Sequence, residues 1–63
     1  MPAGGEILIE FVVQGNSVKA TAIDGVSGTE ASVVGPASAP QAALADAARR
    51  KLEYLLKKQP GRR

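Results

Sequence analysis

The side chains that could perform acid, base or nucleophilic chemistry are few in this sequence. The chain of 63 residues has no cysteine and no histidine, which excludes disulfides, the common zinc frameworks and every Ser-His or Cys-His nucleophile. Two carboxylates, Glu10 and Glu30, are predicted on one face of a sheet, but on opposite edge strands and about 10 Å or more apart. We therefore expect no catalytic residue, no cofactor site and no metal site, and predict that the chain is not an enzyme.

The charged residues offer a second kind of chemistry, which is the binding of phosphate. Residues 1–40 hold four acids and one lysine, a net charge of −3, whereas residues 41–63 hold seven bases and two acids, a net charge of +5. One interpretation is a nucleic-acid interface made by Arg49, Arg50, Lys57, Lys58, Arg62 and Arg63. The alternative interpretation, that these cations serve stability and solubility, fits at least as well. Cations near a helix C-terminus complement its dipole and keep a small domain soluble.

Three strands are predicted to precede these basic residues. Residues 6–14 are rich in β-branched and apolar side chains and end at Gly15-Asn16, a dipeptide typical of a two-residue hairpin. A second strand over residues 17–24 and a third over residues 29–35 follow. In the turn between them, we expect Asp24 to accept backbone N–H bonds and Gly28 to adopt a left-handed conformation.

A helix is predicted after the strands. Ser38 is a candidate N-cap, Pro40 falls in the first turn and Gln41 occupies the third position of a capping box, and these cues agree. Good helix formers continue to about Lys58, and Pro60-Gly61 follows as the stop signal. At 100° per residue one side of this helix is apolar, and it carries Leu44, Ala45, Ala48, Leu52, Leu55 and Leu56.

The two hairpin registers predict which sheet side chains this helix covers. If Gln14 opposes Ser17 and Ala22 opposes Ala31, one face collects the residues that a Leu-Ala helix would bury, namely Ile7, Ile9, Phe11, Val13, Val18, Ala20, Ala22, Ala31 and Val33. The predicted class is α+β, a three-stranded antiparallel meander with one C-terminal helix on one face (βββα). Residues 1–5 are expected to be a flexible N-terminus, residues 6–58 the single domain and residues 59–63 a basic C-terminal tail.

The other face of the predicted sheet also carries apolar side chains. Because one helix covers only one side, these side chains must face water, a tail of the chain that packs back on them, or another molecule. They are Leu8, Val12, Ile23 and Val34. A second copy is the simplest partner, so we expect a homodimer, formed through this face, by edge pairing of the first or third strand, or by exchange of the helix about residues 35–37. Another protein partner is the remaining option, and scattered surface valines and leucines are also normal.

Composition sets the cellular context that we expect. With 44% hydrophobic and 22% charged residues, the composition predicts a globular rather than a disordered chain. It has no apolar run of the roughly 18 residues that a membrane span needs and no signal-type segment after its opening residues. We therefore predict a cytoplasmic protein that does not contact the membrane, acting as a self-associating interaction or accessory domain, with nucleic-acid binding as the alternative.

Several short motifs resemble a family of short alphaproteobacterial proteins classed as a domain of unknown function. They are Gly15-Asn16, Val18-Lys19, Ala22-Ile23-Asp24, Gly28-Thr29-Glu30, Ser32-Val33-Val34-Gly35-Pro36 and Arg50-Lys51-Leu52-Glu53-Tyr54-Leu55-Leu56. The resemblance covers roughly residues 6–58 and implies no activity. Some members bear the label serine hydroxymethyltransferase, which we interpret as a mislabel, because one helix on three strands cannot enclose pyridoxal phosphate.

Overall fold

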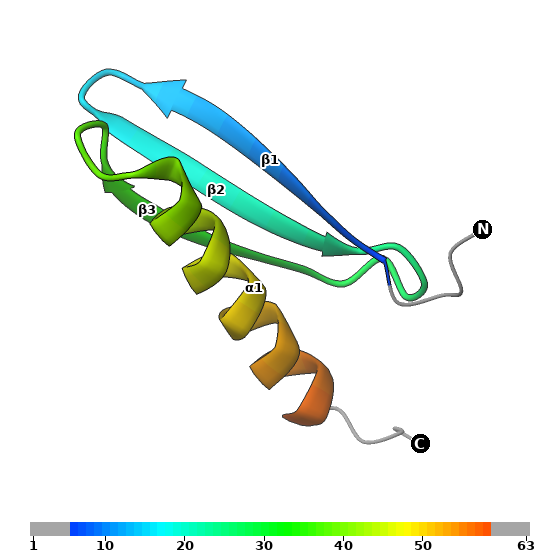
Figure 1. Cartoon of the computed structure of the whole chain (residues 1–63). Coiled ribbons are helices and arrows are strands. Elements are labelled where there is room, and N and C mark those ends of the chain that lie inside the picture. Colours follow the sequence, from blue (N-terminus) through cyan, green and yellow to red (C-terminus); the bar gives the residue numbers. More distant parts are fainter. Residues whose placement is uncertain (1–5, 59–63) are drawn as a thin grey trace.

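The computed structural model describes residues 6–58 and confirms the predicted βββα class (Figure 1). Strands β1 (Ile7–Gln14), β2 (Ser17–Asp24) and β3 (Glu30–Pro36) form one antiparallel sheet in the order β1-β2-β3, and helix α1 (Gln41–Lys58) follows. The third strand begins and ends one residue later than its predicted range. The predicted flexible N-terminus (residues 1–5) and basic tail (residues 59–63), which includes Arg62 and Arg63, lie outside the described residues.

Both predicted turns are confirmed in detail. Gln14 pairs with Ser17 across the hairpin, and Gly15 has a φ of +62°, a conformation that costs glycine no steric strain. In the second turn the Asp24 carboxylate accepts hydrogen bonds from the Ser27 backbone N–H at 2.9 Å and from the Ser27 hydroxyl at 2.6 Å. Gly28, with a φ of +80°, donates its N–H to the Asp24 carbonyl at 2.8 Å. These bonds fix the connection that returns the chain to the sheet.

The helix begins later than the capping pattern predicts. The carbonyl of Pro40 accepts the N–H of Leu44 at 3.3 Å, so Pro40 occupies the N-cap position and α1 starts at Gln41. Ser38 instead lies in a turn that is closed by the N–H of Ala39 and the carbonyl of Pro36 at 2.9 Å. The prediction of a Ser38 cap was therefore wrong, because the Gly-Pro strand end is followed by a turn of its own before the helix starts.

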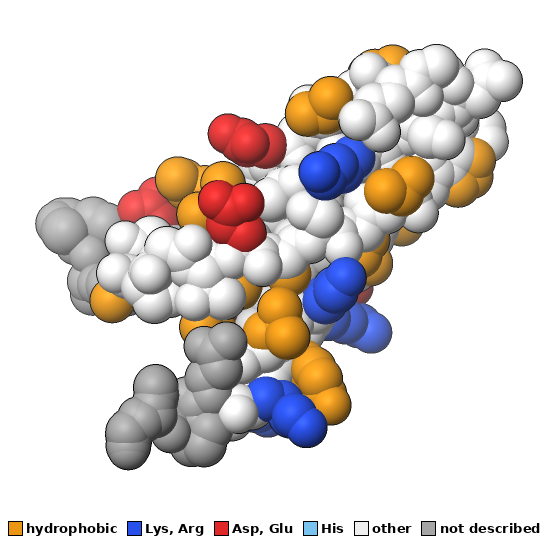
Figure 2. Space-filling model, turned by 180° about the vertical axis from the view of Figure 1, so that it is seen from behind, with side chains coloured by type: hydrophobic (Ala, Val, Ile, Leu, Met, Phe, Trp, Pro, Cys, Tyr) orange, Lys and Arg blue, Asp and Glu red, His pale blue; other side chains and the backbone are white. Residues whose placement is uncertain are grey.

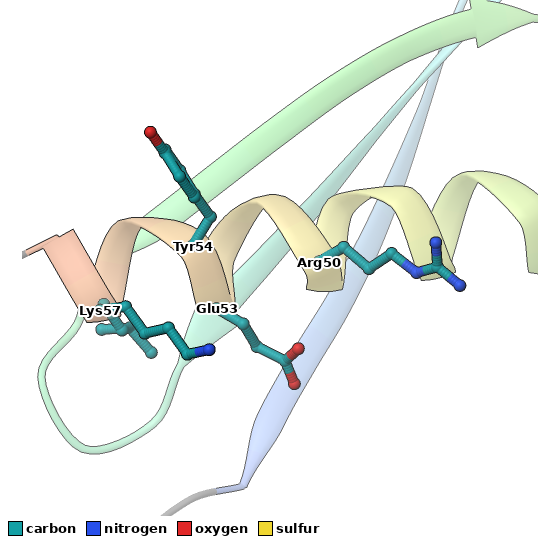
Figure 3. Close-up of a pocket in the computed structure, with 5 residues that line it drawn as sticks. Arg50, Glu53, Tyr54 and Lys57 are labelled. Carbon is teal, nitrogen blue, oxygen red and sulfur yellow. The ribbon is translucent and has the colours of Figure 1, made fainter.

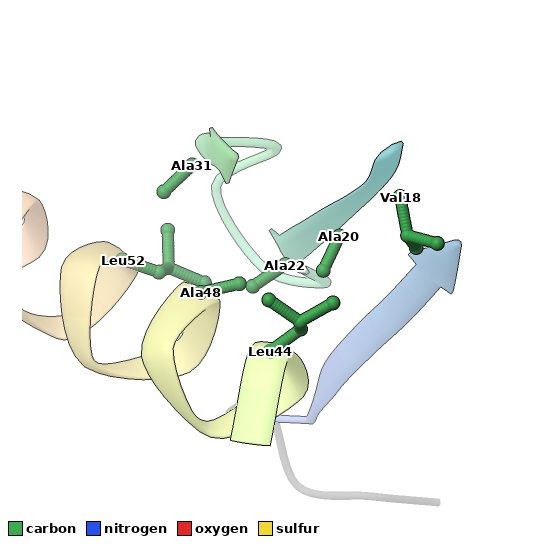
Figure 4. Packing of buried hydrophobic residues seen from close by; sticks show 7 residues of the cluster. All are labelled: Val18, Ala20, Ala22, Ala31, Leu44, Ala48 and Leu52. Atoms are coloured by element: carbon green, nitrogen blue, oxygen red, sulfur yellow. The ribbon is translucent and has the colours of Figure 1, made fainter. Parts of the chain in front are cut away.

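Helix α1 packs mainly against β2 and β3 (Figure 1). The buried cluster (Figure 4) joins side chains of β2, β3 and the helix, and it consists of Val18, Ala20, Ala22, Ala31, Leu44, Ala48 and Leu52. Strand β1 contributes only Ile7 and Ile9, as partly buried neighbours of that cluster. Phe11 and Val13 were expected to share the covered face, yet they are 36% and 68% exposed. The face was predicted correctly, but the helix does not reach this half of β1.

Small side chains let the helix approach the sheet closely. Four of the seven buried apolar residues are alanines, and Gly35 on β3 lies so close to α1 that a β-carbon there would come within 2.5 Å of Leu44 Cδ2. Leu52 is the largest side chain that is fully buried. The core of this domain is therefore compact but contains little apolar volume.

Because Leu52 fills the centre of this core, its truncation should be severe. We expect Leu52→Ala to lower the free energy of unfolding by about 2–5 kcal/mol, a large share of the roughly 3–5 kcal/mol that a core of this size supplies. Urea denaturation followed by circular dichroism measures the loss. Glu53→Ala, at the neighbouring exposed position, is the control and should stay within about 0.5 kcal/mol of the parent. Equal effects of the two variants would contradict this description of the core.

The turn after β2 should make stability depend on pH. Hydrogen bonds from the hydroxyl and backbone N–H of Ser27 lower the pKa of Asp24 below its ordinary value. A carboxyl with a lowered folded-state pKa stabilises fully above its unfolded pKa of about 3.9, and this stabilisation is lost as pH falls through the folded pKa. Asp24→Asn should therefore be less stable than the parent near pH 7, with a gap that shrinks below pH 4.

Denaturation curves at pH 7 and pH 3 check this expectation. Ser27→Ala removes the hydroxyl donor but keeps the backbone N–H, so its stability profile should lie between those of the parent and Asp24→Asn. Parallel pH profiles for all three proteins would contradict the assigned role of Asp24.

Candidate interaction surface

The sheet face opposite the helix contains the four apolar residues predicted as an interface. Leu8, Val12 and Val34 are 53%, 48% and 63% exposed, whereas Ile23 is half-buried. The register places Leu8 beside Ile23 near one end of the sheet, and Val12 beside Lys19 and then Val34 near the other. This outer face therefore carries two separate apolar spots rather than one patch.

A polar row divides these two spots. Glu10, Thr21 and Ser32 are cross-strand neighbours, and the Thr21 and Ser32 hydroxyls form a hydrogen bond of 2.8 Å. Seen from behind in Figure 2, the apolar side chains of the outer face lie among acidic and basic ones. The outer face as a whole is thus less suited to burial than the sequence pattern indicates.

Strand β1, in contrast, is apolar and exposed on both of its faces. Leu8 and Val12 point to the outer face, while Phe11 and Val13 point to the helix side and extend beyond the reach of α1. These four residues, here called the β1 surface, are each at least 36% exposed. Phe11, Val12 and Val13 are consecutive, and Leu8 is separated from them by Ile9 and Glu10. Several exposed apolar side chains on one strand mark it as a candidate interaction site. Two of the predicted interface residues belong to this surface, and Phe11 and Val13 are additions.

The free edges of β1 and β3 differ in how they are protected. On β3 the Lys51 ammonium group donates a hydrogen bond of 2.9 Å to the Ser32 carbonyl at that edge, and Pro36, which has no N–H to offer, ends the strand. Lysine and proline are common means of blocking an edge strand. Strand β1 has neither between Ile7 and Gln14, and among residues 6–58 no element other than β2 pairs with it. β1 is therefore the open edge of the described sheet.

The basic residues of α1 do not form a single positive face. Arg49, Arg50, Lys57 and Lys58 are all exposed. Arg50 forms an ion pair with Asp46 at 3.0 Å, and the Lys58 ammonium group lies 5.6 Å from the centre of the Tyr54 ring. At 100° per residue, Arg50 and Lys57 share their side of the helix with Asp46 and Glu53, whereas Arg49 and Lys58 lie on different flanks.

A hollow of about 450 Å³ lies on the helix near its C-terminal end. Its lining comes entirely from α1, and in Figure 3 the labelled side chains of Arg50, Glu53, Tyr54 and Lys57 project from one helix with no second element closing over them. A small-molecule site encloses most of its ligand's surface. This shallow hollow therefore lacks the enclosure that such a site needs.

The remaining candidate chemistry is also dispersed. Glu10 on β1 pairs with Thr21, and Glu30 on β3 pairs with Ile23. The two carboxylates therefore lie on opposite edge strands, as predicted, and also in different cross-strand rows. Residues 6–58 contain no group of three or more acidic, cysteine or histidine side chains placed to hold a metal ion. Within the same range no helix has the length and apolar character needed to cross a membrane.

Comparison with known proteins identifies a family but no characterised relative. Searches of curated proteins and of solved structures found no match. The family described as "Domain of unknown function (DUF6898)" matches residues 4–59, which include every strand and the helix of the structure. The protein is therefore a member of the DUF6898 family.

Proposed function

We propose that this chain is a non-enzymatic module that associates with a second copy of itself, with the β1 surface at the centre of the contact. The observation that carries this proposal is the exposure of β1 on both of its faces. Helix α1 packs on β2 and β3 and leaves Phe11 and Val13 exposed, while Leu8 and Val12 are exposed on the outer face. An apolar surface of this kind gains free energy when it is removed from water.

A second copy is favoured over an unrelated partner by the simplicity of the contact that it needs. A two-fold contact needs only one self-complementary patch, so a single exposed strand suffices to build it. The core is small, because most of its buried apolar residues are alanines. Since binding that occurs only in the folded state adds to folding stability, association compensates for the stability that this core lacks.

The centre of the contact moves relative to the sequence-based prediction. Leu8 and Val12 remain in it, but Ile23 is already half-buried and Val34 lies on the opposite edge strand, beyond Lys19. Phe11 and Val13 take their place because they continue the same strand on its other face. The proposed contact is therefore a strand with both its faces, not one face of the whole sheet.

Sedimentation equilibrium tests the proposal directly. We expect the average mass to rise from monomer towards dimer as protein concentration increases. Val13→Lys places a charge in the β1 surface and should weaken association about tenfold or more, the equivalent of about 1.4 kcal/mol.

Val26→Lys is the matched control. Val26 is 67% exposed, almost the same as Val13 at 68%, but it lies in the turn between β2 and β3. This variant should associate like the parent. A parent protein that stays monomeric at every concentration, or two lysine variants that behave alike, would overturn the proposal.

Nucleic-acid binding is the second candidate function. It is supported by the exposure of Arg49, Arg50, Lys57 and Lys58 on one helix, and it is weakened by the charge balance that Asp46 and Glu53 provide. Phosphate contacts release counterions, so affinity must fall steeply as salt rises. Titration of DNA and RNA at 50 mM and 200 mM salt tests this alternative. Absence of binding at the lower salt concentration would eliminate it.

A further inference from the structure

We infer that the second copy pairs along the free edge of β1, antiparallel to it, so that two three-stranded sheets join into one six-stranded sheet with Phe11 on the two-fold axis. This inference rests on the self-association proposed above and adds its geometry. It starts from the contrast between the two sheet edges. The β3 edge is occupied by Lys51 and ends in Pro36, whereas β1 is open over Ile7–Gln14.

The register of the β1–β2 hairpin shows which backbone groups point outward. Residues that flank a two-residue turn form a hydrogen-bonded pair, and such pairs alternate along an antiparallel ladder. Gln14 and Ser17 flank this turn, and the Glu6 carbonyl accepts the Gly25 N–H at the other end. The even-numbered residues of β1 therefore bond to β2, and the N–H and C=O groups of Ile7, Ile9, Phe11 and Val13 face the free edge.

Two registers allow the longest pairing between two β1 strands. In an antiparallel pair, a residue whose backbone groups face the partner strand lies opposite a residue whose backbone groups face back. Odd-numbered residues of one β1 therefore oppose odd-numbered residues of the other, and the two-fold axis passes through the same residue in both strands. An axis at Glu10 or at Phe11 lets seven residues of the Ile7–Gln14 strand pair, whereas an axis at Ile9 or Val12 lets five residues pair. The long registers are therefore centred on Glu10 or Phe11.

Charge decides between these two registers. An axis at Glu10 sets two carboxylates directly opposite each other, which is destabilising. An axis at Phe11 sets Phe11 against the partner's Phe11, Ile9 against the partner's Val13, and Glu10 against the partner's Val12. Because Val12 is the cross-strand neighbour of Lys19, each Glu10 then enters the row that holds the partner's Lys19. The Phe11 register thus gains apolar contacts and moves the two Glu10 side chains from directly opposite to diagonal positions about 7–8 Å apart. The partner's Lys19 lies two strand spacings, about 10 Å, from each Glu10.

The contact area predicts a weak and reversible dimer. Seven paired residues span about 24 Å, and a strand with its side chains is about 10 Å thick, so each copy contributes about 240 Å² of contact. Stable interfaces commonly bury about 800 Å² per partner. Association should therefore be weak enough to reverse on dilution.

Crosslinking of single-cysteine variants tests the register. The native sequence has no cysteine, so only the introduced cysteine can form a disulfide. Only a residue on the two-fold axis faces its own copy, at a Cα separation of about 5.5 Å that suits a disulfide. Under mild oxidation we expect Phe11→Cys to form dimers at least about tenfold faster than Glu10→Cys, Val12→Cys or Ile23→Cys. Faster crosslinking of the Glu10 variant would overturn the register, and faster crosslinking of the Val12 or Ile23 variant would indicate a contact through the outer face.

Hydrogen exchange on the unmodified protein provides a test that needs no substitution. The amides of Ile9, Phe11 and Val13 should exchange fast in dilute samples and at least about tenfold more slowly in concentrated ones. The amides of Glu10 and Val12, which bond within the hairpin, should be protected in both and serve as internal controls. Unchanged exchange at Phe11 and Val13 in samples that sediment as dimers would overturn edge pairing but leave self-association standing. Absence of any dimer would overturn the proposed function itself.

Discussion

The width of one helix is the constraint on which this structure depends. An α-helix with its side chains is about 10–12 Å across, whereas three strands spaced about 4.8 Å apart, with the side chains of the two edges, form a wider platform. A single helix can therefore cover two strands fully but not three. In this chain α1 packs against β2 and β3, and the surface left open on β1 follows directly from that choice.

The side chains of the sheet determine which two strands are covered. Ala20 and Ala22 on β2 and Ala31 and Gly35 on β3 are small, so the backbone of α1 can approach these strands closely. Strand β1 presents the larger side chains of Ile9, Phe11 and Val13 to the same side, and of these only Ile9 packs against the buried cluster. Close packing thus favours β2 and β3, but the alanines that permit the approach contribute little apolar area of their own. The alanines therefore explain both the close packing of this core and its small apolar volume.

Sequence patterns predicted the elements and their register but not the lateral position of the helix. The Gly15 and Gly28 turns fix the strand pairing by local backbone chemistry, so the residues that share a face were correct. Periodicity, however, assigns Phe11 and Val13 to a face without stating how far a helix extends over it. In the sequence, only the difference in side-chain size between β1 and the other two strands indicated where the helix would lie. The bond from Lys51 to the Ser32 carbonyl was equally hidden, because it joins residues 19 positions apart.

The placement of charge on β1 bears on whether its open edge is a defect or a feature. A strand that must stay solitary usually carries lysine, proline or an inward-pointing charge that disfavours pairing with another chain. In β1 the one charged side chain is Glu10, whose backbone groups bond to β2, while the four residues whose backbone groups face outward are Ile7, Ile9, Phe11 and Val13. The same sheet blocks its other edge with Lys51 and Pro36. The fold thus protects one edge and leaves the apolar one open, and the proposed pairing of β1 gives this asymmetry a physical reason.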